Sequence, residues 1–384
     1  MKEVVIVDSC RTAIGKKNGA FSQYRSDELA ALILNAITKR ANVDPAIVED
    51  VILGCVTQAK EQGGNIARTA ALIAGFPKQV PGVTIDRQCG SSQQAVHFGA
   101  QAIASGDMDI VIAGGVENMT RVPMFSNMEN VTHSEKLIAK YEIVHQGISA
   151  EKIAEKWGLS RVALDHYALR SHKLAIAAMK KGSFDQEIVP VEVKKDDGSK
   201  EKISKDEGPR HDTNLEALAK LTPVFQENGN ITAGNASQMS DGASALLLMS
   251  RDKANELGLK PKARIIARTV IGSDPTMMLT GPIEATRKVL KKAGLTIEKI
   301  DRYEVNEAFA SVPLAWLNDL RGDLSKLNVN GGAIANGHPL GATGTKLFTT
   351  LLHELERING RYGLVAICEG MGMANATIIE RIND

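Results

Sequence analysis

Two stretches of the sequence, one near each end, share the same order of a charged entry, a buried apolar run, a glycine-rich turn and a helix. The first leads from Asp50 to a turn at Cys89, 39 residues on, and the second leads from Asp301 to a turn at His338, 37 residues on. We interpret this recurrence as a duplicated βα unit, in which Cys89 and His338 occupy equivalent strand-to-helix turns. Packing of the two units would bring those helix N-termini close together.

Short apolar runs alternate with helical periodicity along the rest of the chain. Strands are expected over Val4–Val7, Val51–Gly54, Val83–Ile85, Ile110–Ala113 and Leu364–Ile367. An amphipathic helix is expected over Asp27–Ala41, and another begins near Cys89. This alternation predicts an α/β fold whose sheets are covered by helices. With 384 residues, the chain exceeds the size at which one core keeps growing, so two or three packed units are expected.

The stretch from residue 118 to residue 240 is more polar and interrupts the two units. It holds a polar helical region over Glu151–Lys181 and a charged segment in which Asp197-Gly198 predicts a surface hairpin turn. Such an insertion is typical of a lid or ligand-binding unit, and a surface excursion without a role is the alternative. We therefore predict an N-terminal half over 1–117 plus 241–259, an inserted loop domain over 118–240 and a C-terminal half over 260–384.

Charge and cysteine content exclude several classes of function. Lys plus Arg number 46 against 45 Asp plus Glu, which gives no field for binding nucleic acid or an anionic membrane. The four cysteines form no CxxC pair, so neither a metal site nor a disulfide framework is expected. The sequence contains no apolar stretch of the length that a membrane span needs, and its opening residues do not form a signal peptide. These features predict a cytoplasmic protein with free thiols.

Cys89 is the candidate nucleophile. It lies in Asp-Arg-Gln-Cys-Gly-Ser-Ser, where a strand, a sharp turn and a helix would place the sulfur at a helix N-terminus. The helix dipole there is expected to lower the pKa of the thiol. Inert packing is the alternative for any cysteine, but it predicts apolar neighbours, and these neighbours are polar. Cys10 and Cys55 follow strands without such a setting and are predicted to be core thiols.

Three further residues have settings suited to catalysis. His338 lies in a turn dense in glycine, where the backbone can approach a ligand closely. Cys368 ends a buried strand just before glycines, whose free N–H groups suit a developing oxyanion. Asn306 can orient a water or an oxyanion, and a helix N-cap is its alternative role. His166 and His172 are predicted to be surface residues.

Four segments together resemble the thiolase family, over nearly the whole chain. They are Arg-Gln-Cys-Gly-Ser-Ser around Cys89, Asn-Glu-Ala-Phe-Ala from Asn306, Asn-Gly-Gly-Ala-Ile-Ala-Asn-Gly-His-Pro-Leu-Gly-Ala ending at Ala342, and Cys-Glu-Gly-Met-Gly-Met from Cys368. The resemblance implies a five-layer αβαβα core of two duplicated halves with an inserted loop domain. It also implies acyl-CoA and CoA as substrates, no other cofactor, no metal, and a homodimer or homotetramer.

The resemblance also implies a role for each matching residue. Cys89 would take the acyl group, His338 would activate it, and Cys368 would be the second acid/base. Asn306 with a bound water would hold one thioester oxygen, and the N–H groups of Cys89 and Gly370 would form the other oxyanion hole. The positions predicted to bind substrate are His145, Ser237 and Ala236 along the pantetheine path and Arg210 near the nucleotide.

The expected reaction is thiolytic cleavage of a 3-ketoacyl-CoA, or the reverse Claisen condensation. Gln146, Gln238 and Met371 depart from the commonest pattern of the family, which favours bulky or unusual acyl chains. A carrier-protein-dependent ketoacyl synthase is a second interpretation, although Cys368 stands where that class has a second histidine. A non-catalytic protein that only binds acyl-CoA or lipid is a third, and it predicts the loss of a reactive residue.

Overall fold

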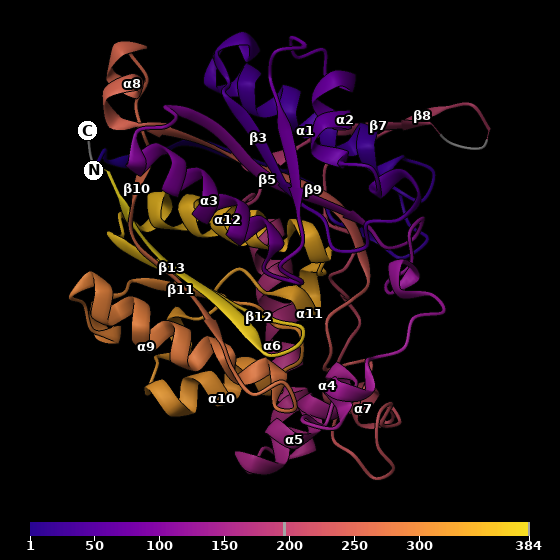
Figure 1. Ribbon diagram of the computed structural model, residues 1–384. Coiled ribbons are helices and arrows are strands. Elements are labelled where there is room, and N and C mark those ends of the chain that lie inside the picture. The colour runs from indigo at the N-terminus through magenta and orange to yellow at the C-terminus, as the bar shows by residue number, and fades with distance from the viewer. Residues whose placement is uncertain (195–196, 383–384) are drawn as a thin grey trace.

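The computed structural model describes residues 1–194 and 197–382 (Figure 1). Nine strands form the path of one large mixed sheet, which divides into two halves. The first half has the order β1-β9-β5-β3-β4 and comprises β1 (Val4–Thr12), β3 (Asp50–Gly54), β4 (Gly82–Ile85), β5 (Ile110–Asn118) and β9 (Ser240–Ser250). The second has the order β10-β13-β12-β11 and comprises β10 (Ala263–Gly272), β11 (Arg302–Val305), β12 (Tyr362–Glu369) and β13 (Met373–Arg381). The short β2 (Gly15–Lys16) and β6 (Ile188–Val189) pair with β9 and β1.

The pairing pattern shows that the two halves repeat one another. β9 runs antiparallel to β1 and β5, and β13 runs antiparallel to β10 and β12 in the same way. β3 is parallel to β5, as β11 is to β12. The register shifts by one residue between Ile6 and Asp8 in β1, and again between Ile265 and Ala267 in β10. A bulge repeated at the same place in two sheets supports the predicted duplication.

Hydrogen bonds show which residues of the two halves are equivalent. The carboxylate of Glu49 accepts from the N–H of Ile110 at the start of β5, and the carboxylate of Asp301 accepts from the N–H of Tyr362 at the start of β12. The match of Asp50 with Asp301 predicted from the sequence is therefore wrong by one residue. Asp50 and Asp301 are both aspartates, but the residue equivalent to Asp301 is Glu49. The difference matters because a shift of one residue turns each side chain to the opposite face of the sheet.

Six helices complete the five predicted layers (Figure 1). They are α1 (Ser26–Ala41), α2 (Ile66–Ile73), α3 (Ser91–Ser105), α9 (Gly281–Ala293), α10 (Ser311–Leu320) and α12 (Thr343–Ile358). An apolar cluster joins α1 and α2 to one face of the first half, and another joins α9 and α10 to one face of the second. The third cluster joins α3 and α12 to the inner faces of both halves. The αβαβα core is therefore confirmed, with the two halves also linked by a short antiparallel pairing of β1 with β10.

Burial explains why α3 and α12 occupy the centre. Every residue of α12 from Thr343 to Leu355 is buried, polar ones included, so this helix needs protein on all sides. By contrast, α1 keeps one exposed face and carries Asp27 and Glu28 in its first turn and basic residues in its last, which suits the helix dipole.

The inserted stretch is built from short elements and one helix of 20 residues beside this core. They are α4 (Glu135–Ile138), α5 (Gln146–Lys156), α6 (Arg161–Lys180), β7 (Val191–Lys194), β8 (Lys200–Ile203) and α7 (Leu215–Ala219), and the remaining short helices of the chain are α8 (Arg251–Glu256) and α11 (Ala333–Asn336). The single helical region predicted over Glu151–Lys181 is two helices, broken where Gly158 takes a φ of +61°. The hairpin is confirmed, because β7 and β8 pair antiparallel about Asp197-Gly198; residues 195–196 lie outside the described residues. The predicted domain limits remain predictions.

Candidate active site

Cys89 lies two residues before α3, at the end of the turn that leaves β4. Gln88 takes a left-handed φ of +47°, and the Ser91 hydroxyl accepts from the N–H of Arg87 and donates to the carbonyl of Gln88. The turn is thus held by side-chain hydrogen bonds, and it leaves Cys89 partly exposed on the wall of two adjoining cavities.

His338 occupies the equivalent turn before α12, as the sequence predicted. Its Nδ1 lies 2.6 Å from Oγ1 of Thr343, and that hydroxyl donates to the carbonyl of Pro339 at 2.9 Å. Since the hydroxyl proton is used, Nδ1 must be the donor in the first pair. Nε2 then carries the lone pair and lies 3.4 Å from Nδ2 of Asn306. The ring therefore presents a basic nitrogen beside Asn306, which is not the helix N-cap of the alternative interpretation, because α10 begins only at Ser311.

Burial decides the protonation of these groups. It raises the pKa of the Cys89 thiol well above its usual range, and the nearby Cys368 and Glu369 raise it further. The expectation of a lowered pKa is wrong, because the loss of solvation outweighs the backbone hydrogen bond that favours the thiolate. Burial also lowers the pKa of His338 to about 3, so its imidazole is neutral at pH 7. A neutral imidazole is the form that can accept a proton from a thiol.

Cys368 and Gly370 come from the end of β12 and the tight turn into β13. Left-handed φ values at Met371 and Gly372 make that turn. Gly370 lines both cavities, whereas Cys368 is fully buried and is absent from the described lining residues of either. Burial and the neighbouring Glu369 raise the pKa of Cys368 to about 12, so the thiol is protonated at neutral pH.

The inner cavity, of about 270 Å³, brings most of the predicted residues together. Its lining includes Cys89, His338, Gly370, His145, Ser237 and Ala236. Asn306 is buried behind this wall and reaches it through His338. His145 stacks on Phe225 with ring centroids 5.0 Å apart, and its Nδ1 accepts from the N–H of Gly147 at the start of α5.

The outer cavity, of about 480 Å³, shares the Cys89 wall and is mostly apolar. Its apolar lining comes from the segment before α5 and from the core, namely Val56, Met124, Phe125, Met128, Val131, Ile143, Val144, Met278, Leu340 and Met371. Gln146 lines both cavities, and its amide lies 3.9 Å from the sulfur of Met124. Gln238 lines the inner cavity only, and its amide donates to the carbonyls of Gly208, Ile334 and Ala335, so it holds the backbone near His338.

Arg210 is the one predicted substrate-binding residue that lies outside both cavities. It is exposed, and its N–H donates to Nδ1 of His172. The prediction that His172 is a surface residue is wrong: it is buried, and burial with the charge of Arg210 lowers its pKa to about 4. Cys10 and Cys55 are both fully buried, which confirms them as core thiols.

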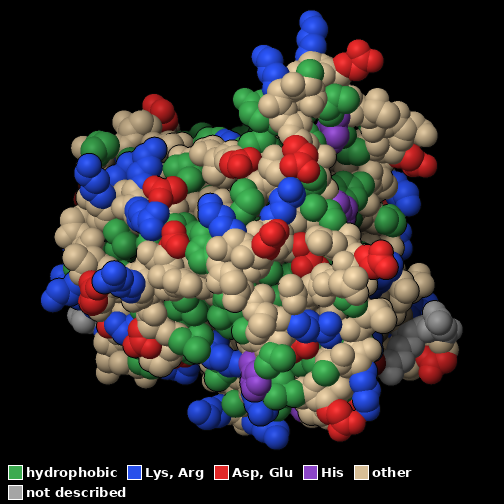
Figure 2. Space-filling model, turned by 90° about the horizontal axis from the view of Figure 1, so that it is seen from below, with side chains coloured by type: hydrophobic (Ala, Val, Ile, Leu, Met, Phe, Trp, Pro, Cys, Tyr) green, Lys and Arg blue, Asp and Glu red, His purple; other side chains and the backbone are tan. Residues whose placement is uncertain are grey.

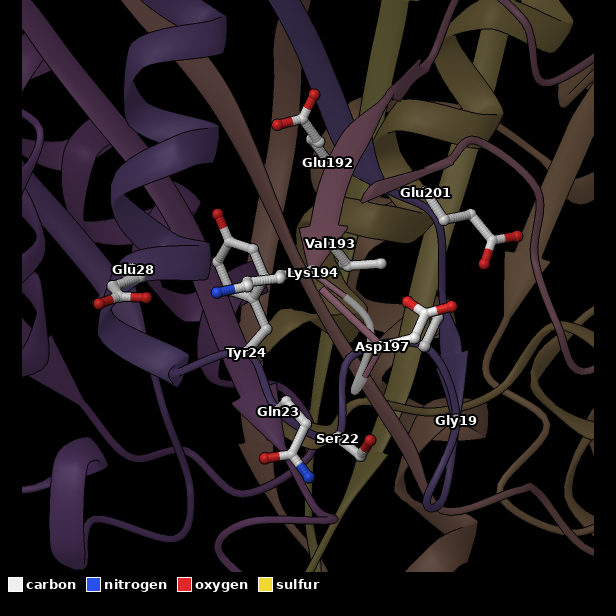
Figure 3. Close-up of a pocket in the computed structure, with 11 residues that line it drawn as sticks. Gly19, Ser22, Gln23, Tyr24, Glu28, Glu192, Val193, Lys194, Asp197 and Glu201 are labelled. Carbon is white, nitrogen blue, oxygen red and sulfur yellow. The ribbon is translucent and has the colours of Figure 1, made fainter. Parts of the chain in front are cut away.

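Two observations limit other functional sites. A cavity of about 890 Å³ lies between α1, residues 19–24 and the β7–β8 hairpin (Figure 3), and its described lining does not include Cys89. Its described lining mixes Glu28, Glu192 and Lys194 with Tyr24, and no reactive pair is present there. Within residues 1–194 and 197–382, no three His, Cys, Asp or Glu side chains gather as a metal ion would require.

One face of the molecule shows how its surface charges are arranged. On the face that carries the inserted elements, basic and acidic side chains are interspersed with small apolar groups (Figure 2). No helix in the described part of the chain has the length and apolarity needed to cross a bilayer.

Comparison with known proteins places this geometry in a family. The model of the thiolase N-terminal domain matches residues 4–252, and that of the thiolase C-terminal domain matches residues 259–381. The chain belongs to the thiolase family. It is 50% identical to the steroid 3-ketoacyl-CoA thiolase FadA6 of Mycobacterium tuberculosis, covering 100% of this chain and 95% of that protein. It is 47% identical to a 3-ketoacyl-CoA thiolase of Aeromonas salmonicida over the whole of both chains.

A solved structure extends the likeness to three dimensions. The acetyl-CoA acetyltransferase of Bacillus anthracis superposes with a TM-score of 0.92 at 41% identity, covering 100% of this chain and 99% of that one. The predicted thiolase fold and the predicted acyltransferase class are thereby confirmed.

Sequence reasoning missed two residues that hold the thiolase turns in place. Thr343 orients His338, and the buried Glu117 accepts from the N–H of Gly341 just beyond it at 2.8 Å. Thr343 stands one residue beyond the Gly-His-Pro-Leu-Gly-Ala segment, so its position was visible. No local signal marks Glu117, because its partner lies 224 residues away.

Proposed function

We propose that this protein cleaves a 3-ketoacyl-CoA with coenzyme A to give acetyl-CoA and a shortened acyl-CoA, or runs the reverse Claisen condensation. The observation that carries the proposal is a single cavity walled by the Cys89 sulfur and the neutral His338 ring. A nucleophile and its base on one wall, beside an apolar chamber, suit acyl transfer through a covalent intermediate.

In the first step, Nε2 of His338 takes the proton of Cys89, and the sulfur attacks the 3-keto carbon. The N–H groups of Cys89 and Gly370 hold the resulting alkoxide, and each such donor contributes about 10²-fold in rate. Collapse of the tetrahedral species breaks the bond between carbons 2 and 3. The acyl group stays on Cys89, and the enolate of acetyl-CoA leaves.

In the second step, Cys368, which is buried behind the cavity wall but close enough to Cys89 to raise its pKa, gives its proton to the enolate carbon and acetyl-CoA departs. A thiol with a pKa of about 12 is protonated at neutral pH and is therefore ready to act as an acid. Coenzyme A then enters, loses its proton to the same acid/base set, and takes the acyl group from Cys89. Asn306 with a water holds the thioester oxygen in this step.

Each cavity is assigned one part of the substrate. The inner cavity, lined by His145, Ser237 and Ala236, takes the pantetheine arm, and Arg210 at the surface meets the phosphates of the nucleotide. The apolar outer cavity takes the acyl chain. Its size and the similarity to a steroid 3-ketoacyl-CoA thiolase favour a bulky acyl group over a short one.

The first test is Cys89→Ala with acetoacetyl-CoA and longer 3-ketoacyl-CoA thioesters. We expect thiolysis to fall about 10³-fold or more, because the nucleophile is lost. Cys10→Ala removes a thiol remote from the cavities and should keep activity within about twofold. Mass spectrometry of the wild type should find one acyl group on Cys89. Thiolysis retained by Cys89→Ala would defeat the assignment, and turnover of acyl-carrier-protein substrates in place of CoA esters would favour a ketoacyl synthase.

We further propose a cytoplasmic homodimer or homotetramer. Free thiols support a reducing compartment. β4 ends the strand path and packs against α2, and Val83 of β4 and Leu72 and Ile73 of α2 are all exposed. An apolar sheet edge is a natural place for a second copy to pair. Light scattering of the purified protein should give a mass of two or four chains, and a monomer would contradict this.

A further inference from the structure

Glu369 is a buried carboxyl group that accepts no hydrogen bond from the described residues. It follows Cys368 at the end of β12 and is fully buried, yet neither of its oxygens has a hydrogen-bond partner among the described residues. One of those oxygens lies so close to Gly90 that a β-carbon at that position would be 1.9 Å from it. The carboxyl group therefore packs directly against Gly90, in the turn that carries Cys89. A buried, unpaired carboxyl group is costly and calls for an explanation.

The duplication supplies a direct comparison. Seven residues after the matched pair Ile110 and Tyr362, β5 carries Glu117 and β12 carries Glu369. Each glutamate reaches across to the other half: Glu117 contacts Gly341 beyond His338, and Glu369 contacts Gly90 beyond Cys89.

The two glutamates differ in their hydrogen bonds. The carboxylate of Glu117 accepts from the N–H groups of Val56, Thr57 and Gly341 and from the amide of Gln62. Glu369 occupies the equivalent position in the second half, but no described N–H group donates to its carboxyl group. A structural role of the kind that Glu117 performs is therefore not available to Glu369.

The groups that face Glu369 are those of the active-site turn. Arg87, Asp86 and Cys89 approach it from the turn before α3, and Cys368 adjoins it on its own strand. Burial raises the pKa of Glu369 well above its usual range, and Arg87 only partly offsets this. A negative charge here would add to the charge of a thiolate at Cys89 in a site with little solvent.

We propose that Glu369 is a positioning residue of the active site whose proton state governs Cys89. With its proton, Glu369 is neutral and Cys89 can give its own proton to His338. Without it, the carboxylate opposes the thiolate, and the nucleophile stays a thiol. The inference rests on the proposed function in taking Cys89 as the nucleophile.

The test measures the thiolate directly. Alkylation of Cys89 by iodoacetamide, followed by mass spectrometry across a pH series, reports the midpoint at which the thiolate forms. Glu369→Gln keeps the shape and removes the charge, so its midpoint should lie about one pH unit below that of the wild type. Glu369→Met removes the charge and suits an apolar site, and it should show the same shift even if the glutamine variant folds poorly.

A matched control and a clear contrary result complete the experiment. Glu356→Gln makes the same substitution in the last turn of α12, where Glu356 pairs with Lys262, and should leave the midpoint unchanged. Equal midpoints in the wild type, Glu369→Gln and Glu369→Met would overturn the proposal and leave Glu369 with a packing role only. Since alkylation needs no turnover, this outcome is distinct from a failure of the proposed thiolysis, which Cys89→Ala tests.

Discussion

At the scale of single residues, the site depends on which nitrogen of His338 carries the proton. The chain from Nδ1 to Thr343 and on to the carbonyl of Pro339 has one consistent direction of donation. It leaves the lone pair on Nε2, beside Nδ2 of Asn306, and in the proposed mechanism this nitrogen accepts the proton of Cys89. The hydroxyl of Thr343 therefore acts on the reaction through the tautomer of His338.

Replacing Thr343 by valine tests this tautomer. The valine keeps the shape but leaves the Nδ1–H donor buried without an acceptor, which costs about 1–3 kcal/mol. We expect kcat for thiolysis to fall about tenfold. Thr349→Val, further along α12, removes a buried hydroxyl that donates to the backbone carbonyl of Thr345, away from His338, and should change kcat little. Equal rates for the two variants would mean that Thr343 does not set the proton on His338.

At the scale of elements, the contact between α3 and α12 sets the distance between the two catalytic turns. A β-carbon on Gly344 of α12 would lie 2.2 Å from the backbone nitrogen of Gln93 on α3. Backbone cannot yield as a flexible side chain can, so only glycine allows this approach.

Gly344→Ala should force these helices apart. We expect a loss of about 1–3 kcal/mol in stability from overpacking, together with a fall in thiolysis because Cys89 and His338 separate. Gly272→Ala, at the end of β10, meets nothing within 4 Å and serves as the control. Calorimetry and rate measurements on both variants check this, and an alanine at 344 with wild-type activity would contradict the close-approach argument.

Helix α3 also gives a prediction for the pH dependence of stability. Its residue His97 is buried, and Nε2 of this side chain lies 2.7 Å from the hydroxyl of Thr377 on β13. Burial lowers the pKa of His97 to about 3. As the pH falls below about 6.5, His97 becomes protonated in the unfolded state but stays neutral in the folded state until about pH 3. The free energy of unfolding therefore decreases by about 1.4 kcal/mol per pH unit between these two values. His97→Gln should therefore lose less melting temperature than the wild type between about pH 7.5 and about pH 5. Parallel curves would show that His97 is protonated in the folded state.

How far the sequence alone predicts these elements depends on the range of the interactions. Local turns and motifs suffice to place Cys89 and His338 at equivalent turns and to recognise the layered core. The one-residue error at Asp50 arises because side chains of different length, Glu49 and Asp301, accept from the equivalent N–H groups of Ile110 and Tyr362, which no local pattern reveals. The sign of the pKa shift at Cys89 is also beyond local patterns, because it depends on burial and on Cys368 and Glu369 from the other end of the chain.

At the scale of the whole molecule, each half sends one glutamate to the catalytic turn of the other half, but only Glu117 forms hydrogen bonds there. We therefore expect Glu117 alone to contribute to stability. Glu117→Gln can accept fewer hydrogen bonds and leaves buried N–H groups of both halves without an acceptor, at about 1–3 kcal/mol for each group. We expect a lower melting temperature and slower thiolysis, since the turn of His338 loosens.

Glu369→Gln gives up no hydrogen bond and removes a buried carboxyl group, so it should melt at or above the wild-type temperature. Calorimetry of the two glutamine variants under the same conditions shows whether both glutamates stabilise the fold or only Glu117 does. Equal losses would mean that both glutamates are structural. A loss confined to Glu117→Gln would mean that Glu117 holds the two halves together. Glu369, its counterpart in the other half, would then affect the ionisation of Cys89 and not the stability of the fold.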